Sequence, residues 1–323
     1  MPINSRFQEI SLTAVAWEDC SFRFSPPGDL TRLKESLQEV GLLAPPRLRR
    51  QNGERYQVIT GWKRLWAAAQ LDWDTVPALT LPGDTPEASC LLLIIHDNAL
   101  SRGFNPLEQA LLAPRLLAHW DRETVVRRFL PLLGVPPTAG HLERLLAAGA
   151  LEAPWQTLLA QERLALSAAA RLARWPEPER EASRPFFEQL PLSQSKQEEF
   201  LETIDLLARR EGRTPARILS RPELQQYLTQ ADLTPQEKAG AVRRLLKGWL
   251  LPRLSAAEET FQAGLKRLGL KQHPRLRLTP PPAFEGQDFQ VEIKFRDAAE
   301  LRQLLTELAR LAGEEEFSKL TDH

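Results

Sequence analysis

Residues 56–68 read Tyr-Gln-Val-Ile-Thr-Gly-Trp-Lys-Arg-Leu-Trp-Ala-Ala, and this stretch decides the fold of the first part of the chain. Its first five residues predict a short strand, and the apolar spacing after Gly61 predicts a helix. Asn52-Gly53 lies just before it and follows the extended segment 46–50. Asn-Gly is typical of a tight hairpin turn, because both turn positions favour positive φ. The stretch therefore predicts an α/β unit with short, locally paired strands.

Further elements are predicted on both sides of this stretch. Apolar residues at helical spacing predict a helix over 30–40, and Gly41 follows as a natural end. Residues 76–81 predict another strand, and residues 87–98 predict a buried helix. Together these elements predict one domain over residues 1–105.

The rest of the chain has a different pattern. Residues 106–252 contain no strand-like segment, and their apolar residues lie three and four apart between frequent prolines, which predicts a series of short helices. We expect a helical domain over 106–180, a second over 181–272, and a linker at 175–185. Residues 273–323 predict two strands and one helix, a unit too small to be stable unless it packs on the helices or on a second copy. The predicted fold class is therefore α+β.

Length and composition exclude several kinds of protein. The 323 residues allow two or three domains, and 42 basic against 42 acidic side chains leave no overall positive field to attract nucleic acid. The longest aliphatic run, 91–95, is far shorter than a membrane span, and residues 1–20 lack the pattern of a signal peptide. Cys20 and Cys90 alone predict neither a metal cluster nor a disulfide scaffold. We expect a cytoplasmic protein with no membrane partner.

Gly61, Lys63 and Arg64 form a candidate anion site. They lie where a strand gives way to a helix, so backbone N–H groups point outward at the positive end of the helix dipole. Glycine allows an anion to approach closely, and the two side chains add positive charge. Adjacent cations at a helix start are also common on solvated surfaces, so this pattern leaves both interpretations open.

Asp97, Asn98 and Arg102 form a second candidate cluster, at the end of the predicted helix 87–98. A carboxylate beside an amide offers hard oxygen ligands of the kind that Mg²⁺ uses together with a phosphate, and Arg102 adds a third cation. The alternative is a helix exit followed by a helix entry at Asn105-Pro106. That alternative explains the second pair but not the three residues before it.

Four ordered stretches resemble the N-terminal domain of the ParB family, the chromosome and plasmid partition proteins. They are Arg23-Phe24 with the helix that follows, Gly41-Leu-Leu-Ala-Pro-Pro-Arg-Leu-Arg49, Gly61-Trp-Lys-Arg-Leu-Trp-Ala-Ala68, and Asp97-Asn98 through Arg102 to Asn105-Pro-Leu-Glu-Gln-Ala110. The third resembles the family's arginine-rich phosphate box, and the fourth resembles its box that begins with glutamate and asparagine. Four boxes in the family's order are far more specific than any one of them.

The resemblance implies both a fold and a function. The fold is a ParB-like N-terminal α/β domain, an all-helical region with a helix-turn-helix, and a small β-β-α unit. The function is a switch that uses CTP and Mg²⁺, since family members close two protomers around DNA when nucleotide binds and reopen after slow hydrolysis. The implied partners are a nucleotide, DNA and a second copy of the chain, and the implied location includes the nucleoid. At most the chain would be a slow CTPase, with no catalytic residue assigned.

The resemblance assigns roles to particular positions. By the resemblance, the phosphates are held by Gly61, Lys63, Arg64 and Arg102. The metal and the triphosphate are bound by Asp97 and Asn98. The base side is lined by Pro45, Arg47 and Arg49.

The chain departs from the family's boxes at three positions. Trp62 stands where the phosphate box has glutamate, Lys63 stands where it has arginine, and Asp97 is one methylene shorter than the usual glutamate. These changes motivate a rival interpretation, an adaptor that kept the fold but lost nucleotide binding and sequence-specific DNA reading. Sulfiredoxin and a small-molecule serine kinase share the fold. They need a cysteine in the phosphate box or histidines beside its arginine, and this chain has neither there.

A degenerate helix-turn-helix is predicted after the first domain. Helices are expected over 124–133 and 138–146, with a turn at 134–137 between them. A recognition helix normally offers Arg, Lys, Asn or Gln to base edges, whereas this one offers few such groups. The candidate DNA-binding residues are Thr138, His141 and Arg144.

Overall fold

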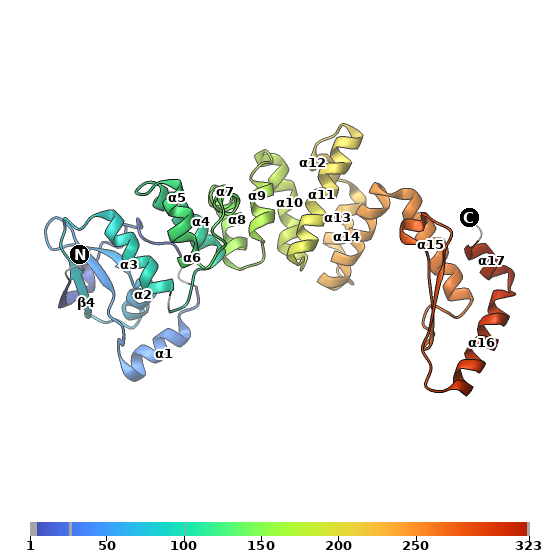
Figure 1. Ribbon diagram of the computed structural model, residues 1–323. Helices are drawn as coiled ribbons and strands as arrows, with labels where there is room; N and C mark the ends of the chain where they lie inside the picture. Colours follow the sequence, from blue (N-terminus) through green and yellow to red (C-terminus); the bar gives the residue numbers. More distant parts are fainter. Residues whose placement is uncertain (1–4, 26–27, 100, 322–323) are drawn as a thin grey trace. The chain divides into compact units, whose positions relative to one another are not determined.

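The computed structural model describes residues 5–25, 28–99 and 101–321 (Figure 1). The chain divides into two compact units, Met1–Glu198 and Glu199–His323. The division falls inside one long helix, α11 (Gln194–Glu211). The domain limits expected at residues 105, 180 and 272 remain predictions. No helix in the described part of the chain is long and apolar enough to cross a bilayer.

A four-stranded sheet in the order β1-β4-β2-β3 forms the centre of the N-terminal region. Its strands are β1 (Arg6–Ser11), β2 (Arg47–Arg50), β3 (Tyr56–Thr60) and β4 (Thr75–Leu81). The antiparallel β2–β3 pairing confirms the predicted hairpin, although only Gly53 of the Asn52-Gly53 pair has a positive φ. However, β4 pairs in parallel with β2 and antiparallel with β1, which the sequence did not predict as a strand. The expectation of purely local pairing is therefore wrong for β1 and β4.

Three helices pack with this sheet (Figure 1). They are α1 (Thr31–Val40), α2 (Trp62–Gln70) and α3 (Glu87–Ala99), and a short 3₁₀ turn, η1 (Leu12–Ala14), follows β1. Leu48, Val58 and Leu65 are almost fully buried in the core that the sheet shares with α1 and α2. All three helices confirm the sequence prediction, because each has an apolar face at helical spacing.

A series of short helices fills the remainder of the first unit. They are α4 (Pro106–Leu117), α5 (Arg122–Thr124), the π-helical turn η2 (Val125–Phe129), α6 (Leu130–Leu132), α7 (Ala139–Gly149), α8 (Ala153–Ala160), α9 (Leu166–Leu172), α10 (Glu177–Gln189) and the start of α11. The packing of α7 against α4 and α9 holds the middle of this region together.

The linker expected at 175–185 is wrong, because α10 covers most of it. Pro178 lies in the first turn of this helix, where a missing N–H breaks no hydrogen bond. Phe186 and Phe187 are buried on the same helix. The proline- and glutamate-rich composition therefore belongs to a helix start, where acidic residues also suit the helix dipole.

The second unit ends in the small unit predicted from the sequence. Beyond α11 it contains α12 (Pro215–Leu219), α13 (Pro222–Thr229), α14 (Pro235–Leu250), α15 (Pro252–Arg267), β5 (Leu276–Thr279), the 3₁₀ turn η3 (Pro282–Phe284), β6 (Gln290–Ile293), α16 (Ala298–Ala312) and α17 (Glu315–Thr321). Figure 1 shows the β5–β6 hairpin with α15 and α16 beside it. Phe261, Leu276 and Leu304 are buried together. The strands and helix thus pack within the chain, with α15 completing their core.

Gly61 is a position at which the surrounding structure leaves no room for a side chain. Its φ is +95°, and a Cβ atom there would lie 2.7 Å from Pro46 Cβ and 2.9 Å from Pro46 Cα. Gly53 in the hairpin also has a positive φ, +76°, but has open space around it. We expect Gly53→Ala to lower the free energy of unfolding by about 1 kcal/mol and Gly61→Ala by about 3 kcal/mol, because the second adds a clash to the backbone strain.

Urea unfolding followed by circular dichroism measures both variants under the same conditions. Equal losses for the two alanines would show that the contact with Pro46 relaxes without cost.

Candidate anion-binding pocket

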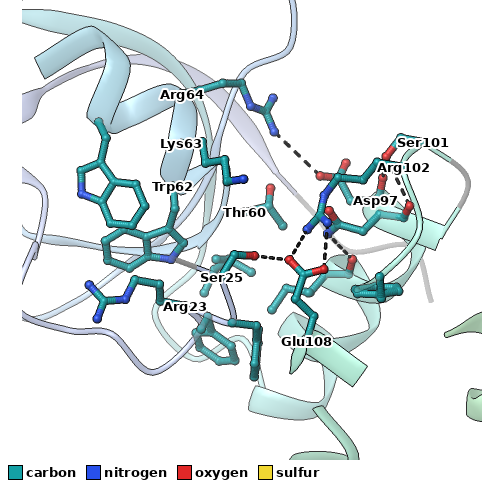
Figure 2. Close-up of a pocket in the computed structure, with 18 of the residues that line it drawn as sticks. Arg23, Ser25, Thr60, Trp62, Lys63, Arg64, Asp97, Ser101, Arg102 and Glu108 are labelled. Atoms are coloured by element: carbon teal, nitrogen blue, oxygen red, sulfur yellow. Dashed lines mark hydrogen bonds and ion pairs between the residues drawn. The ribbon is translucent and has the colours of Figure 1, made fainter. Parts of the chain in front are cut away.

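A cavity of about 340 Å³ lies where β3 turns into α2. Its other walls come from the segment 22–25, the end of α3 and the loop that leads into α4 (Figure 2). The lining residues are Phe22, Arg23, Phe24, Ser25, Leu33, Ile59, Thr60, Gly61, Trp62, Lys63, Arg64, Trp66, Ile94, Asp97, Asn98, Ser101, Arg102, Phe104 and Glu108. The two clusters expected from the sequence therefore meet in one pocket.

The bend at Gly61 directs the start of α2 toward this cavity. Gly61 is the N-cap of α2, and its carbonyl accepts the first helical hydrogen bond from the N–H of Leu65, at 3.1 Å. The N–H groups of the first helical turn have no partner within the helix and carry the positive end of its dipole. Lys63 is exposed, whereas Arg64 is partly buried. An anion in the pocket would meet backbone donors and two cations.

Asp97 faces two arginines across the pocket wall. Its carboxylate accepts a 2.6 Å hydrogen bond from Arg47 Nη1 and lies 4.0 Å from Arg64 Nη2. Arg64 also donates to the carbonyl of Ala44. Burial lowers the pKa of Arg64, Asp97 opposes that change, and the charge of Arg47 adds to it. The pair of guanidinium groups therefore has one carboxylate between them and retains a surplus positive charge.

Asn98 is held by its own helix. Its Nδ2 donates to the carbonyl of Ile94 at 2.8 Å, and its own carbonyl accepts from the N–H groups of Ser101, Arg102 and Gly103. These bonds end α3 and fix the start of the loop. The side chain lines the pocket, but its amide hydrogens face the helix backbone.

Glu108 is the buried acidic residue of the pocket, with 1% of its surface exposed. Arg102 donates to both of its oxygens, at 2.8 and 2.9 Å, and Ser25 donates to one of them. Glu108 also accepts from the N–H of Asn105 at 3.0 Å, which completes the capping box of α4. Burial acts to raise the pKa of Glu108, but the hydrogen bonds from Arg102, Ser25 and Asn105 outweigh it, so the pKa lies below its ordinary value.

The charges around the cavity do not balance. Five cations stand on or beside its wall, namely Arg23, Lys63, Arg64, Arg102 and Arg47. Two carboxylates, Asp97 and Glu108, oppose them, which leaves a formal charge of +3. In the part of the chain that the structure describes, neither Lys63 nor Arg23 pairs with a carboxylate, and Arg23 lies 5.9 Å over the ring of Trp66. This surplus suits a polyvalent anion.

Of the residues expected on the base side, Pro45, Arg47 and Arg49, none lines the cavity itself. Arg47 reaches the site through Asp97, but Pro45 and Arg49 are outside the cavity lining. The guanidinium of Arg49 donates to Gln57 Oε1, at 2.6 and 2.9 Å, and to the carbonyl of Thr85 at 2.8 Å. Successive residues of a strand point to opposite faces, so Arg47 and Arg49, two residues apart, point to the same face. Their guanidinium groups nevertheless bond to different partners, and only that of Arg47 reaches the site.

Several lining residues were not among the expected site residues. The most informative are Arg23, Ser25, Thr60, Trp62 and Glu108. Arg23 and Glu108 lie within the stretches that resemble the family boxes, and that resemblance could have identified them as site residues. Ser25 and Thr60 carry no pattern of their own. The indole of Trp62 forms part of the wall and packs against Trp17 and Trp66, with ring centroids 6.4 and 5.3 Å away, so it leaves the cavity open.

The residues present do not form a metal site by themselves. Both oxygens of Asp97 face guanidinium groups, and the amide of Asn98 is bonded to its helix. Within residues 5–25, 28–99 and 101–321, no three His, Cys, Asp or Glu side chains are grouped to hold an ion. We therefore derive no step through a resident Mg²⁺.

The candidate DNA-binding residues lie on α7. Thr138 caps this helix, and its hydroxyl accepts from the N–H of His141 at 3.2 Å. The side chain of Arg144 is exposed, while that of His141 is half-buried. Exposed Glu143 between them pairs with Arg122. Within the described part of the chain, Arg144 is therefore the unpaired cation of this helix face, whereas the carboxylate of Glu143 is already paired.

The comparison with protein families identifies the N-terminal region. The model of the ParB N-terminal domain matches residues 8–94. A probable plasmid-partitioning protein ParB from Thermus thermophilus is 40% identical over 83 residues, which are 26% of this chain and 27% of that protein. A probable chromosome-partitioning protein ParB from Pseudomonas putida is 28% identical over 95 residues, or 29% and 32% of the two chains. The matched region thus spans less than a third of either relative, and the similarity to ParB proteins is established for this N-terminal domain.

Solved structures also align with the chain, at low similarity. The C-terminally truncated chromosome-partitioning protein ParB from Caulobacter crescentus, complexed to the centromeric parS site, is 22% identical and covers 60% of this chain and 98% of its own, with a TM-score of 0.35. The same protein complexed with CTP-gamma-S is 22% identical, covers 57% and 99%, and has a TM-score of 0.26. A Pnob8-like ParB-N domain is 17% identical, covers 80% and 98%, and has a TM-score of 0.39. Scores of this size do not establish a common arrangement of the whole chain.

Replacing Glu108 with glutamine tests the buried ion pair. We expect Glu108→Gln to lower the free energy of unfolding by about 2 kcal/mol at pH 7, because Arg102 loses its counter-ion and Ser25 loses a charged acceptor. The pKa of Glu108 is depressed in the folded protein, so its contribution is present above the unfolded pKa and is lost as pH falls through the folded value. The difference between the two proteins should therefore shrink toward pH 3.

Urea midpoints at pH 7 and pH 3 measure this difference. Glu143→Gln is the matched control, because its side chain is 58% exposed and its pairing with Arg122 should contribute little. A difference between wild type and Glu108→Gln that stays constant with pH would contradict the assignment.

Proposed function

We propose that the pocket binds a nucleoside triphosphate, CTP, and that the bound nucleotide switches the N-terminal domain between two arrangements in a DNA-partition complex. One observation carries the proposal: a cavity of about 340 Å³ at the N-terminus of α2 has a surplus of three positive charges on and beside its wall, Arg47 included. A triphosphate supplies a matching charge and enough oxygens to use the backbone donors and the side chains together. CTP is chosen among nucleotides because the boxes around Gly61 and Asp97 resemble those of the ParB family.

Each part of the pocket has a role in this proposal. The N–H groups after Gly61, with Lys63 and Arg64, bind phosphate oxygens. Arg64 already lies near a carboxylate, so a phosphate can replace Asp97 as its partner at small cost in desolvation. Arg102 provides a further cation from the loop after α3. The aromatic side of the cavity accommodates the less polar part of the nucleotide.

The bonds to Glu108 explain how a bound nucleotide could change the arrangement of the domain. Arg102 joins the loop after α3 to Glu108 in the first turn of α4, and Ser25 joins the segment 22–25 to the same carboxylate. A triphosphate that attracts Arg102 changes what holds these segments together. Binding then favours the arrangement in which the ligand makes more contacts, which is how a ligand shifts a conformational equilibrium.

The proposal extends to metal, hydrolysis and assembly only as far as the family resemblance does. Mg²⁺ would reach Asp97 and Asn98 bound to the triphosphate, since these residues do not hold it alone. In this proposal hydrolysis is slow, and no residue is assigned to it. The curated relatives are named as plasmid- and chromosome-partitioning proteins, so the biological setting we propose is DNA partition, with the chain acting as a homodimer.

Titration calorimetry with CTP, ATP and GTP in the presence of Mg²⁺ tests ligand binding. We expect heat with CTP, and the double variant Lys63→Ala/Arg64→Ala should weaken binding at least about tenfold, because two phosphate contacts are lost. Arg55→Ala is the control. This arginine lies in the hairpin loop, pairs with Glu18 and does not line the pocket.

The same experiment separates the switch from the adaptor. No heat with any nucleotide would overturn the proposal. Unchanged function of the double variant in vivo would favour a protein-docking role for the fold.

Retention on DNA tests the proposed setting. We expect binding that shows little dependence on sequence and falls steeply with salt, because it rests on phosphate contacts rather than base contacts. Arg144→Ala should weaken it and reduce the salt slope by about one, as expected for one lost phosphate contact. Arg184→Ala is the control, because this arginine is already paired with Glu181 and Glu188. Salt-independent retention, or an identical slope for Arg144→Ala, would refute the assignment.

A further inference from the structure

Two buried polar groups in the pocket lack hydrogen-bond partners. Among the described residues, six buried side-chain nitrogen or oxygen atoms have no partner, and two of these are Thr60 Oγ1 and Trp62 Nε1. Thr60 is 4% exposed and Trp62 is 7% exposed, and both line the cavity. They stand on either side of Gly61. Figure 2 shows the Thr60 side chain pointing into the pocket, with the indole of Trp62 along its wall.

An unpartnered buried donor is costly. Leaving such a group without an acceptor costs about 1–3 kcal/mol, and folded proteins pair the large majority of them. Packing explains the ring of Trp62, which contacts Trp17 and Trp66. Packing does not explain its N–H, because a phenylalanine would fill much of the same space without a buried donor.

We propose that Thr60 and Trp62 are ligand-binding residues that donate hydrogen bonds to phosphoryl oxygens of the bound nucleotide. This inference rests on the proposed function and assigns two specificity-determining residues to the same pocket. In the bound state the ligand supplies the acceptors that the chain lacks.

The chemistry of the two groups suits phosphate, and their position favours phosphate over the base or the ribose. An indole N–H only donates, so its partner is an acceptor, and phosphoryl oxygens only accept. Both groups flank the glycine that begins α2, so they lie at the helix end where an anion gains from the dipole. Trp62 also replaces the glutamate of the family's phosphate box. The chain thus exchanges a group that repels phosphate for one that donates to it.

Thr60→Val removes one donor with little change in shape, and Trp62→Phe removes the other together with part of the ring. Trp155→Phe is the matched control, because its Nε1 is also buried without a partner but lies on α8, outside the cavity lining. Thr60→Ser keeps the hydroxyl and should retain binding. Titration calorimetry with CTP and, separately, with inorganic tripolyphosphate measures affinity, both with Mg²⁺ present. Thermal unfolding of the ligand-free proteins measures stability.

We expect Thr60→Val and Trp62→Phe each to weaken both probes about fivefold to tenfold, as for the loss of one hydrogen bond to a charged acceptor. The ligand-free Thr60→Val protein should unfold at the same temperature as wild type or higher, because an unpaired donor has been removed. Trp62→Phe also loses part of a buried ring, so its unfolding temperature should fall, as for other large-to-small core substitutions. Trp155→Phe should leave both affinities unchanged. If Trp62→Phe fails to fold, the comparison of Thr60→Val with Thr60→Ser decides the matter alone.

Three results would overturn the inference. Unchanged affinities in both variants would refute it while leaving the proposed function intact. Weaker binding of CTP but not of tripolyphosphate would place the donors at the base or ribose. A wild-type protein that binds neither probe would refute the proposed function, and this inference with it.

Discussion

The carboxylate of Asp97 lies between Arg47 and Arg64, and the pocket depends on this arrangement. Arg47 belongs to β2, Arg64 to α2 and Asp97 to α3, so a single negative charge ties three elements together. Two arginines this close would repel each other without it. One carboxylate cannot neutralise both, so the same contact that holds the elements in place leaves the surplus charge that attracts an anion.

A second carboxylate, that of the buried Glu108, has a similar part in the same pocket. Glu108 accepts from Arg102, from Ser25 and from the backbone at the start of α4, and these bonds keep it ionised despite its burial. Capping a helix and binding an arginine are usually separate tasks. Here one side chain performs both, so a ligand that draws Arg102 away acts directly on the first turn of α4.

The sequence predicted much of the site because the family boxes place its charged residues. Gly61, Lys63, Arg64 and the Asp97-Asn98 pair do line one cavity. Arg49 shows the limit of that prediction, because nothing in its own segment indicates that Gln57 and Thr85 hold its guanidinium. Trp62 shows another limit, since a departure from a motif does not reveal whether the new side chain closes the pocket or becomes part of its wall.

The sequence by itself determined the local elements: the bend at Gly61, the hairpin around Asn52-Gly53 and the helical spacing of the long middle region. These depend on groups a few residues apart, so short-range sterics and hydrogen bonds specify them. Only the tertiary structure decided which distant groups meet, such as the pairing of β1 with β4 and the bond between Ser25 and Glu108. Such contacts depend on how whole elements bury their apolar faces together, and neither residue of a distant pair specifies that alone.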